Sequence, residues 1–233
     1  MLLDLIFLHG LFVFRDICRF LLNSHVDIYQ FFSLNIFTND TYKVVAFACT
    51  EYDTGVYKVQ THVHTMGTNF WKRIQADFPG VPPIWEPGKF VSGTINCLVK
   101  DSKRVIVSFD LKTESYRRLL LPVVTSTFCV LRDCLSILSN SKTFSDVWLM
   151  KEYGNQDSWT RLFHVPYKGD VGWGNYTRAL YVYDDDRVLL ELMGKLVVYN
   201  SRDGTFKTIR IQKYGGWMMP EVFQESLISP CSE

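Results

Sequence analysis

The sequence has almost no net charge. Lysine and arginine number 25 and aspartate and glutamate 24, which gives a formal net charge of +1. Proteins that bind nucleic acid or anionic membrane surfaces usually present a strong positive field. The composition indicates neither kind of partner, so we expect no nucleic acid and no membrane among the ligands.

A membrane-spanning segment is also lacking. The apolar stretch at residues 1–14, MLLDLIFLHGLFVF, is interrupted by Asp4 and His9, and a spanning helix needs about 20 apolar residues. No positive charge precedes Arg15, as a secretory signal peptide would require. We expect residues 1–24 to form a short helix within an N-terminal apolar segment at 1–38. A membrane or targeting segment, or a stretch without evolved structure, is the alternative.

The six cysteines form no CxxC pair and are irregularly spaced. Cysteine inside an apolar strand behaves as a small hydrophobic residue. We therefore expect free thiols in a reducing compartment, the cytoplasm or the nucleus. An even number of cysteines leaves a disulfide-bonded secreted protein as the alternative.

Motifs that would announce an enzyme are missing. The sequence contains no GxSxG, GxxxxGK[ST], HExxH or GxGxxG. His62 and His64 could share one strand face, but the sequence places no third metal ligand. Asp184-Asp185-Asp186 has too few oxygen ligands at the spacing of a calcium loop, so we expect a solvated hairpin turn. We predict no catalytic residue, no metal ligand and no cofactor.

Four aromatic residues recur at nearly equal intervals. They are Trp71, Tyr116, Trp159 and Phe206, in FWKRI, SYRRL, SWTRL and TFKTI, and they are separated by 45, 43 and 47 residues. Each follows a β-branched or aromatic run and a polar turn, as the return strand of a hairpin does. A period of about 40–50 residues built from strands is typical of propeller blades.

Apolar runs such as 105–107 and 196–198 favour strands that are covered on both faces. We predict an all-β protein, a kelch-like β-propeller or partial propeller with about four recognisable blades. The blade domain would span 39–233. A β-sandwich is the alternative.

Longer strings resemble a known plant family. They include NDTYKVVAFAC (39–49), VIVSFDLKTESYRRLLLP (105–122) and FSDVWLMKEYGNQDSWTRLF (144–163). Together they resemble the F-box-associated interaction domain of plant F-box and F-box/kelch-repeat proteins, over roughly 39–231. The resemblance implies a propeller-like domain that recruits protein substrates to an SCF-type (Skp–cullin–F-box) ubiquitin ligase.

The sequence departs from that family at its start. The F-box of the family, with its LP-containing helical segment and LLRFRCVCKSW-like string, is not visible in residues 1–40. A GSCNGLL-like strand and a WNPxT-like turn are also missing. We interpret the chain as a truncated recognition subunit that would bind the ligase adaptor only if an F-box were supplied. The alternatives are a stand-alone interaction protein and a non-functional remnant.

Three loops are candidates for partner binding, at 79–87, 167–175 and 213–217. Their aromatic residues could anchor a protein substrate or a glycan on a glycoprotein, unless they fill the core instead. The candidate anchors are Trp85, Tyr167, Trp173 and Trp217.

A glycosidase-like propeller is a weaker alternative. Such an enzyme would gather carboxylates in one axial pocket. The candidate carboxylates do not recur at the blade period, so we predict that the chain is not an enzyme. They are Glu86, Asp133, Asp146, Glu191 and Asp203.

Overall fold

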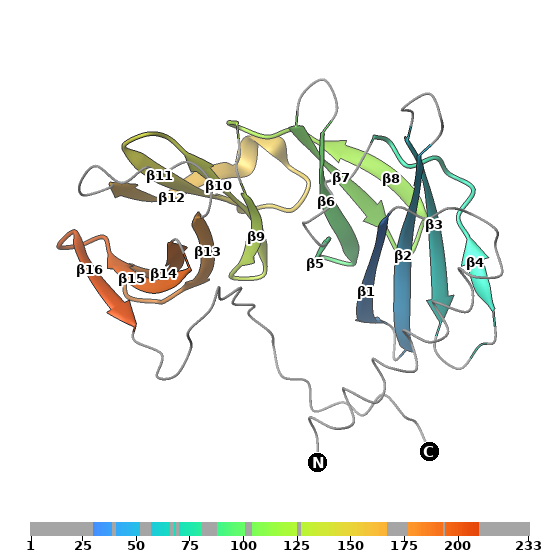
Figure 1. The fold of residues 1–233 in the computed structure, drawn as a ribbon, viewed down its shortest axis with the longest axis horizontal. Helices are drawn as coiled ribbons and strands as arrows, with labels where there is room; N and C mark the ends of the chain where they lie inside the picture. The colour runs from blue at the N-terminus through green and yellow to red at the C-terminus, as the bar shows by residue number, and fades with distance from the viewer. Residues whose placement is uncertain are drawn as a thin grey trace, which may run out of the picture. The chain divides into compact units, whose positions relative to one another are not determined.

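The computed structural model places its strands in two compact units, residues 1–81 and 82–233. It describes residues 30–38, 41–51, 57–65, 68, 70–80, 88–100, 104–124, 127–166, 177–192 and 194–209. The helix expected at residues 1–24 lies outside these ranges. The secondary structure described is β-strand apart from one short 3-10 turn (Figure 1).

The first unit contains one four-stranded antiparallel sheet, sheet 1. Its strands are β1 (Gln30–Thr38), β2 (Thr41–Glu51), β3 (Tyr57–Thr65) and β4 (Trp71–Arg73). The middle of β2 is fully buried, and the ring of Phe47 meets that of Phe78 edge to face at 5.5 Å. Strand β1 pairs with β2 along its whole length, so sheet 1 includes residues that precede position 39.

The second unit contains three further four-stranded antiparallel sheets. Sheet 2 consists of β5 (Lys89–Val91), β6 (Thr94–Lys100), β7 (Arg104–Asp110) and β8 (Ser115–Leu119). Sheet 3 consists of β9 (Thr127–Leu131), β10 (Cys134–Asn140), β11 (Phe144–Met150) and β12 (Trp159–Pro166), with the 3-10 turn η1 (Gln156–Ser158) before β12. Sheet 4 consists of β13 (Thr177–Val182), β14 (Arg187–Leu192), β15 (Lys195–Asn200) and β16 (Thr205–Ile209). In every sheet the strands lie in sequence order, which is the arrangement of a propeller blade.

The four recurring aromatic residues begin or lie in the last strand of each sheet, as the period predicted. Tyr116 pairs with Phe109 and Phe206 with Tyr199, and the rings of each pair are 5.0 and 4.8 Å apart with an interplanar angle of 38°. Sheet 1 repeats this geometry with Trp71 on His64, at 5.1 Å and 38°. Directly opposed rings are among the stronger cross-strand pairs, so in sheets 1, 2 and 4 the repeated aromatic residue stabilises the pairing of the outer strand. In sheet 3, Trp159 is opposite Met150 instead.

Tight turns connect the strands because short polar side chains bind the turn backbone. Asp110 Oδ1 accepts the backbone N–H groups of Lys112 and Thr113, both at 2.8 Å. Asn200 Oδ1 accepts that of Arg202 at 3.0 Å in the corresponding turn of sheet 4. These hydrogen bonds, together with the burial cost that opposes them, leave the pKa of Asp110 below its ordinary value.

Two apolar clusters hold the second unit together. Sheets 2 and 3 share one that includes Ile106, Leu119, Ile137 and Trp159. Sheets 3 and 4 share another that includes Leu138, Phe163, Val188 and Leu190. Sheet 3 is therefore covered on both faces, which explains its uninterrupted apolar runs. The all-β, propeller-type fold class predicted from the repeat is confirmed.

Candidate partner-binding surface

The four aromatic residues proposed as anchors lie outside the described residues. Trp85, Tyr167, Trp173 and Trp217 belong to segments 81–87, 167–176 and 210–233, for which the structure gives no placement. Whether they anchor a partner stays a prediction. The first two segments join the last strand of one sheet to the first strand of the next, and the third follows β16.

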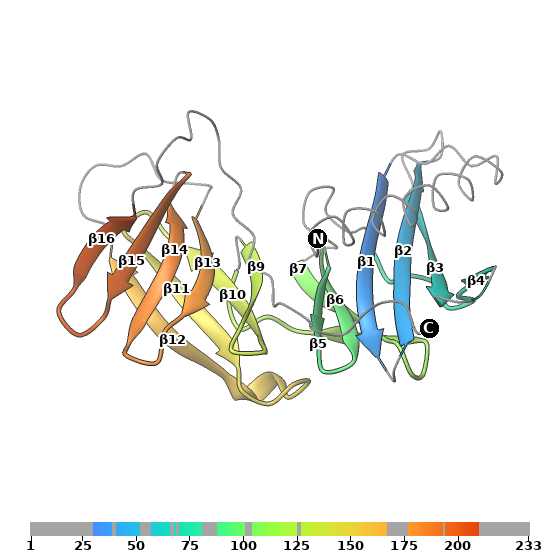
Figure 2. The same ribbon diagram turned by 90° about the horizontal axis from the view of Figure 1, so that it is seen from below.

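The second unit has two distinguishable ends (Figure 2). At the turn end lie the turns that join the first strand of each sheet to the second and the third to the fourth. These are residues 92–93, 111–114, 132–133, 151–158, 183–186 and 201–204. At the opposite end, the connection end, lie the β10–β11 turn at residues 141–143 and the ends of the second and third strands of the other two sheets. A partner could approach either end, and the two ends differ in chemistry.

An arginine–tyrosine group occupies the turn end where sheets 3 and 4 meet. Arg132 Nη2 donates to the carbonyl of Tyr183 at 2.9 Å, which ties the β9–β10 turn to sheet 4. The guanidinium of Arg187 lies 4.9 Å from the centre of the Tyr183 ring, and Tyr181 meets that ring edge to face at 5.1 Å. Arginine and tyrosine are enriched among interface hot spots, and here their side chains are already oriented.

The three consecutive aspartates form an exposed hairpin turn. Asp185 forms an ion pair with Arg187 and Asp186 with Arg202, both at 2.7 Å. The hydrogen bond from Arg187 holds the pKa of Asp185 below its ordinary value. The positive φ of 63° at Asp186 fits a turn residue. The segment is a turn stabilised by arginines, as the sequence predicted.

His62 and His64 lie on β3 and differ in their surroundings. His62 is buried, and burial, reinforced by the charge of Arg73, lowers its pKa. His64 binds the carbonyl of Thr68 through Nε2 at 3.0 Å and stacks on Trp71. Across the described part of the chain, no three His, Cys, Asp or Glu side chains are grouped as a metal site requires.

The connection end of sheet 3 carries a group of charged residues around one carboxylate. Asp146 Oδ1 is 2.7 Å from His164 Nδ1, and its Oδ2 is 3.6 Å from Arg161 Nη1. The ring of Phe144 lies 4.7 Å from that of His164. The carboxylate is 11% exposed, whereas the His164 and Arg161 side chains are 48% and 53% exposed. The largely buried Asp146 side chain therefore holds the half-exposed side chains of Arg161 and His164 in place.

The candidate carboxylates are placed at both ends of the unit. Asp133 and Asp203 lie in turns at the turn end, where Asp203 Oδ1 accepts the Thr205 backbone N–H at 2.9 Å. Asp146 and Glu191 lie near the connection end, and Glu191 is 3.7 Å from Arg178. Glu86 lies outside the described residues.

Sequence reasoning missed a polar contact between sheets 2 and 3. Tyr153, in the long β11–β12 loop, donates to Asn96 Oδ1 at 2.9 Å and is also hydrogen-bonded to the hydroxyls of Thr94 and Ser108. Asn96 is completely buried. The guanidinium of Arg117 covers the Tyr153 ring at 4.7 Å. Partners 57 residues apart give no local pattern, so only the register of the sheets reveals the contact.

None of the described residues belongs to a helix long and apolar enough to cross a membrane.

Comparisons with known proteins agree with this architecture. An F-box/kelch-repeat protein of Arabidopsis thaliana is 29% identical over 205 residues, covering 83% of this chain and 54% of that protein. The F-box protein CPR1 of the same organism is 33% identical over 138 residues, covering 54% of this chain and 33% of its own. The chain thus spans about half the length of the first relative and a third of the second.

Among solved structures, an acylaminoacyl peptidase of Pyrococcus horikoshii matches with a TM-score of 0.43 and 11% identity, over 76% of this chain and 32% of its own. A likeness at that level supports no argument about function. The F-box associated beta propeller domain, in contrast, matches residues 19–229. The sheets in sequence order, the aromatic period and this match together show that the chain belongs to the F-box associated beta propeller domain family.

Proposed function

We propose that this chain is the substrate-recognition part of an SCF-type E3 ubiquitin ligase subunit. The observation that carries the proposal is the family match over residues 19–229, which covers every strand that the structure describes. The relatives are F-box proteins by name. A domain of this kind supplies binding surface, and the ligase partners supply the chemistry.

The geometry supports binding over catalysis. The strands are joined by tight turns whose polar groups bind the turn backbone, and the Tyr181, Tyr183 and Arg187 side chains are held in place before any partner arrives. Preorganised side chains lose little conformational entropy on binding. We therefore propose a protein as the substrate, with a glycan on a glycoprotein as a further possibility, and no catalytic activity of its own. The cytoplasm or the nucleus is the proposed site of action.

Binding to the ligase adaptor is proposed to depend on an F-box joined to this domain. The test compares two purified proteins, the chain itself and the same chain fused behind the F-box of a relative. Immobilised adaptor should retain the fusion and not the chain alone. Saturable binding of the chain alone at micromolar or tighter Kd, about 8 kcal/mol of specific interaction, would contradict this dependence.

Substrate recognition is tested in plant cells. Proximity labelling with the fusion should identify proteins that are absent from a control carrying the F-box alone. Each candidate is then purified and its direct binding to the chain measured. A bound protein that the fusion ubiquitylates, and that the isolated chain protects by competition, supports the proposal. The proposal fails if no candidate binds the purified chain.

A stand-alone interaction protein is the second candidate function. The preoriented Tyr181, Tyr183 and Arg187 side chains would serve such a protein equally, and it predicts competition with longer relatives without ubiquitin transfer. The same competition experiment separates the two, because a stand-alone protein would protect the substrate and its fusion to an F-box would not increase ubiquitylation.

A further inference from the structure

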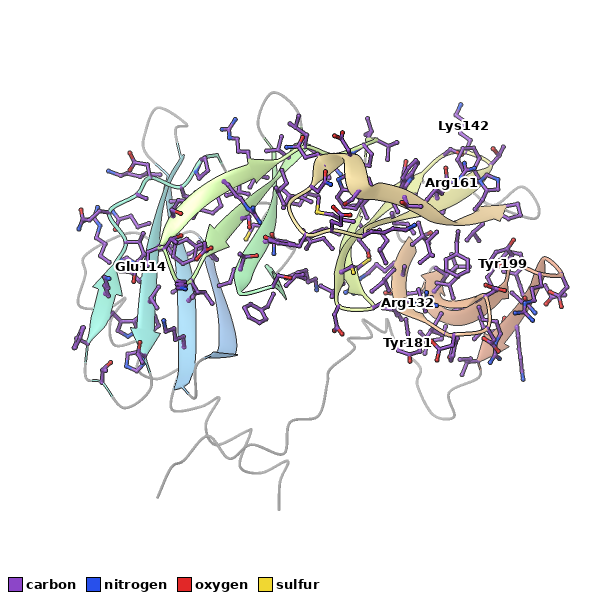
Figure 3. All side chains as sticks on the ribbon, turned by 180° about the vertical axis from the view of Figure 1, so that it is seen from behind. Glu114, Arg132, Lys142, Arg161, Tyr181 and Tyr199 are labelled. Carbon is purple, nitrogen blue, oxygen red and sulfur yellow. The ribbon has the colours of Figure 1, made fainter. Side chains whose placement is uncertain are left out.

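The strongest charged group not used above is centred on Asp146 in sheet 3. Its carboxylate holds His164 at 2.7 Å and Arg161 at 3.6 Å, and both partners project from β12. Lys142, exposed in the turn before β11, adds a second permanent positive charge. Figure 3 shows Lys142 extending away from the strands. We call Lys142, Asp146, Arg161 and His164 the cationic patch.

Asp146 is the one carboxylate of the patch. It orients Arg161 and His164 but does not occupy all of their hydrogen-bonding groups. Arg161 has five N–H donors, and its contact with Asp146 is one long ion pair at 3.6 Å. His164 uses Nδ1 for Asp146, which leaves Nε2 on the far side of the half-exposed ring. The stack with Phe144 further restricts that ring. The patch therefore presents oriented hydrogen-bonding groups together with excess positive charge.

No other carboxylate of sheet 3 neutralises this charge. Among residues 127–166, all of which the structure describes, the remaining acids are Asp133, Glu152 and Asp157, and each lies in a turn-end loop. Strand β11 has seven residues, so it separates the two ends by roughly 20 Å at about 3.3 Å per residue. For Lys142 that distance exceeds two Debye lengths of about 8 Å at physiological salt, whereas Arg161, which pairs with Trp148, lies closer to the turn end. The positive charge of Lys142 is therefore not screened by the other carboxylates of sheet 3.

We propose that the cationic patch binds an anionic segment of the protein substrate, through carboxylate or phosphoryl oxygens. The proposal rests on the proposed substrate-recognition function and adds the chemical class of the bound segment. Arg161 donates hydrogen bonds to the anion from its remaining N–H groups, and Lys142 contributes attraction without a fixed contact. Charge-assisted hydrogen bonds of this kind are stronger than neutral ones and favour specificity. A nucleic acid is a poor fit, because the whole chain has a net charge of only +1.

The test measures binding of fluorescein-labelled peptides to the purified chain by anisotropy. One twelve-residue peptide alternates Glu and Ser, a second carries phosphoserine in place of Glu, and a third carries Lys in place of Glu. We expect the first two to bind and the third not to bind. Raising the salt from 50 to 300 mM should weaken binding at least fivefold, since counterion screening acts on exposed charges. The ratio between the first two peptides identifies carboxylate or phosphoryl recognition.

Variants locate the site. Lys142→Gln should weaken binding about threefold and Lys142→Gln with Arg161→Gln at least tenfold. The matched control is Lys151→Gln, which removes the same charge from the turn end of the same sheet and should change affinity less than twofold. Lys142→Gln also guards against misfolding, because no contact of the Lys142 side chain is present among the described residues; circular dichroism should be unchanged.

Two results would overturn the inference. One is equal binding of the anionic and the Lys peptides, and the other is an equal loss of affinity in Lys151→Gln and Lys142→Gln. A substrate identified by proximity labelling provides a separate check. If the double variant binds that purified substrate as well as the unmodified chain does, the patch is not the site, yet the recognition function stands. If no substrate is found while the peptides bind as expected, the proposed function fails and the binding chemistry stands.

Discussion

Replacing Tyr153 by phenylalanine should destabilise the contact between sheets 2 and 3. The substitution keeps the ring under Arg117 and removes only the hydroxyl group that binds Asn96, Thr94 and Ser108. Asn96 is 0% exposed, so water does not replace the lost donor at Oδ1. A buried acceptor left without its hydrogen bond costs about 1–3 kcal/mol. We expect a loss of about 2 kcal/mol in the free energy of unfolding.

The loss of stability in Tyr153→Phe can be measured by thermal unfolding and by hydrogen exchange. For a chain of this size, about 2 kcal/mol corresponds to a fall in Tm of roughly 4–8 °C. Hydrogen exchange should accelerate in β6 and β7, which carry the three partners of the hydroxyl, and change less in sheet 1. The control is Tyr181→Phe, whose side chain is 51% exposed and whose substitution should stay within about 0.5 kcal/mol.

A double-mutant cycle separates this contact from general loosening. Ser108→Ala and Tyr153→Phe remove two ends of one hydrogen bond of 2.5 Å. Residues that share a network show coupling of about 0.5–3 kcal/mol. Additive effects, or a Tyr153→Phe protein as stable as the control, would refute the view that the Tyr153 hydroxyl holds the two sheets together.

Three further substitutions or measurements test other parts of the second unit. Gly154→Ala should cost more than about 1 kcal/mol in unfolding free energy, because Gly154 has a φ of 85° and a Cβ there would lie 2.7 Å from Arg117 Nη1. Trp159→Phe should cost about 1 kcal/mol, because the Nε1–H group that donates to the Leu120 carbonyl at 3.2 Å is lost; urea unfolding measures this loss. Burial raises the pKa of the Cys97 thiol to about 12, so thiol reagents should label Cys97 only through unfolding at pH 8. The folded state keeps this proton where the unfolded state loses it, so stability should fall as the pH rises from about 9 toward 12.

The glycine and cysteine predictions have their own checks. Gly204→Ala changes a glycine with a φ of 67° and no atom within 4 Å of the added Cβ, so it should be milder than Gly154→Ala. Equal effects would contradict the role of the Arg117 contact. Labelling of Cys97 in the folded protein at the rate of a small-molecule thiol would contradict its burial.

Local patterns predicted the sheets because the information lies within a few residues. Each of the four recurring aromatic residues follows a polar turn. The pairs Phe109–Tyr116 and Tyr199–Phe206 show that such a residue pairs with its neighbour across a single hairpin. The Ser92-Gly93 turn was not among the predicted turns; both residues adopt positive φ, as type I′ hairpin turns require.

The charged and polar groups were harder to predict because they depend on register. Asp146 was considered as an isolated carboxylate, and its pairing with His164 appears only once β11 and β12 are aligned. Strand β1 was not predicted, because its residues precede the first of the four recurring aromatic residues, Trp71. No earlier copy of the repeat exists with which they could be compared. The loops with Trp85, Tyr167, Trp173 and Trp217 remain a prediction about binding.

The order of strands has a consequence for synthesis on the ribosome. Every sheet pairs neighbouring strands only, and hairpins form in microseconds while the chain grows by about 5–20 residues each second. Sheet 2 ends at Leu119, so it is complete 34 residues before Tyr153 is added, or roughly 2–7 s at that rate. During that interval Asn96 has no tyrosine hydroxyl to bind and stays accessible to water or to chaperones. When the β11–β12 loop has been synthesised, Tyr153 can donate its hydrogen bond to Asn96. Sheet 3 thereby supplies the partner that the buried polar group of sheet 2 requires.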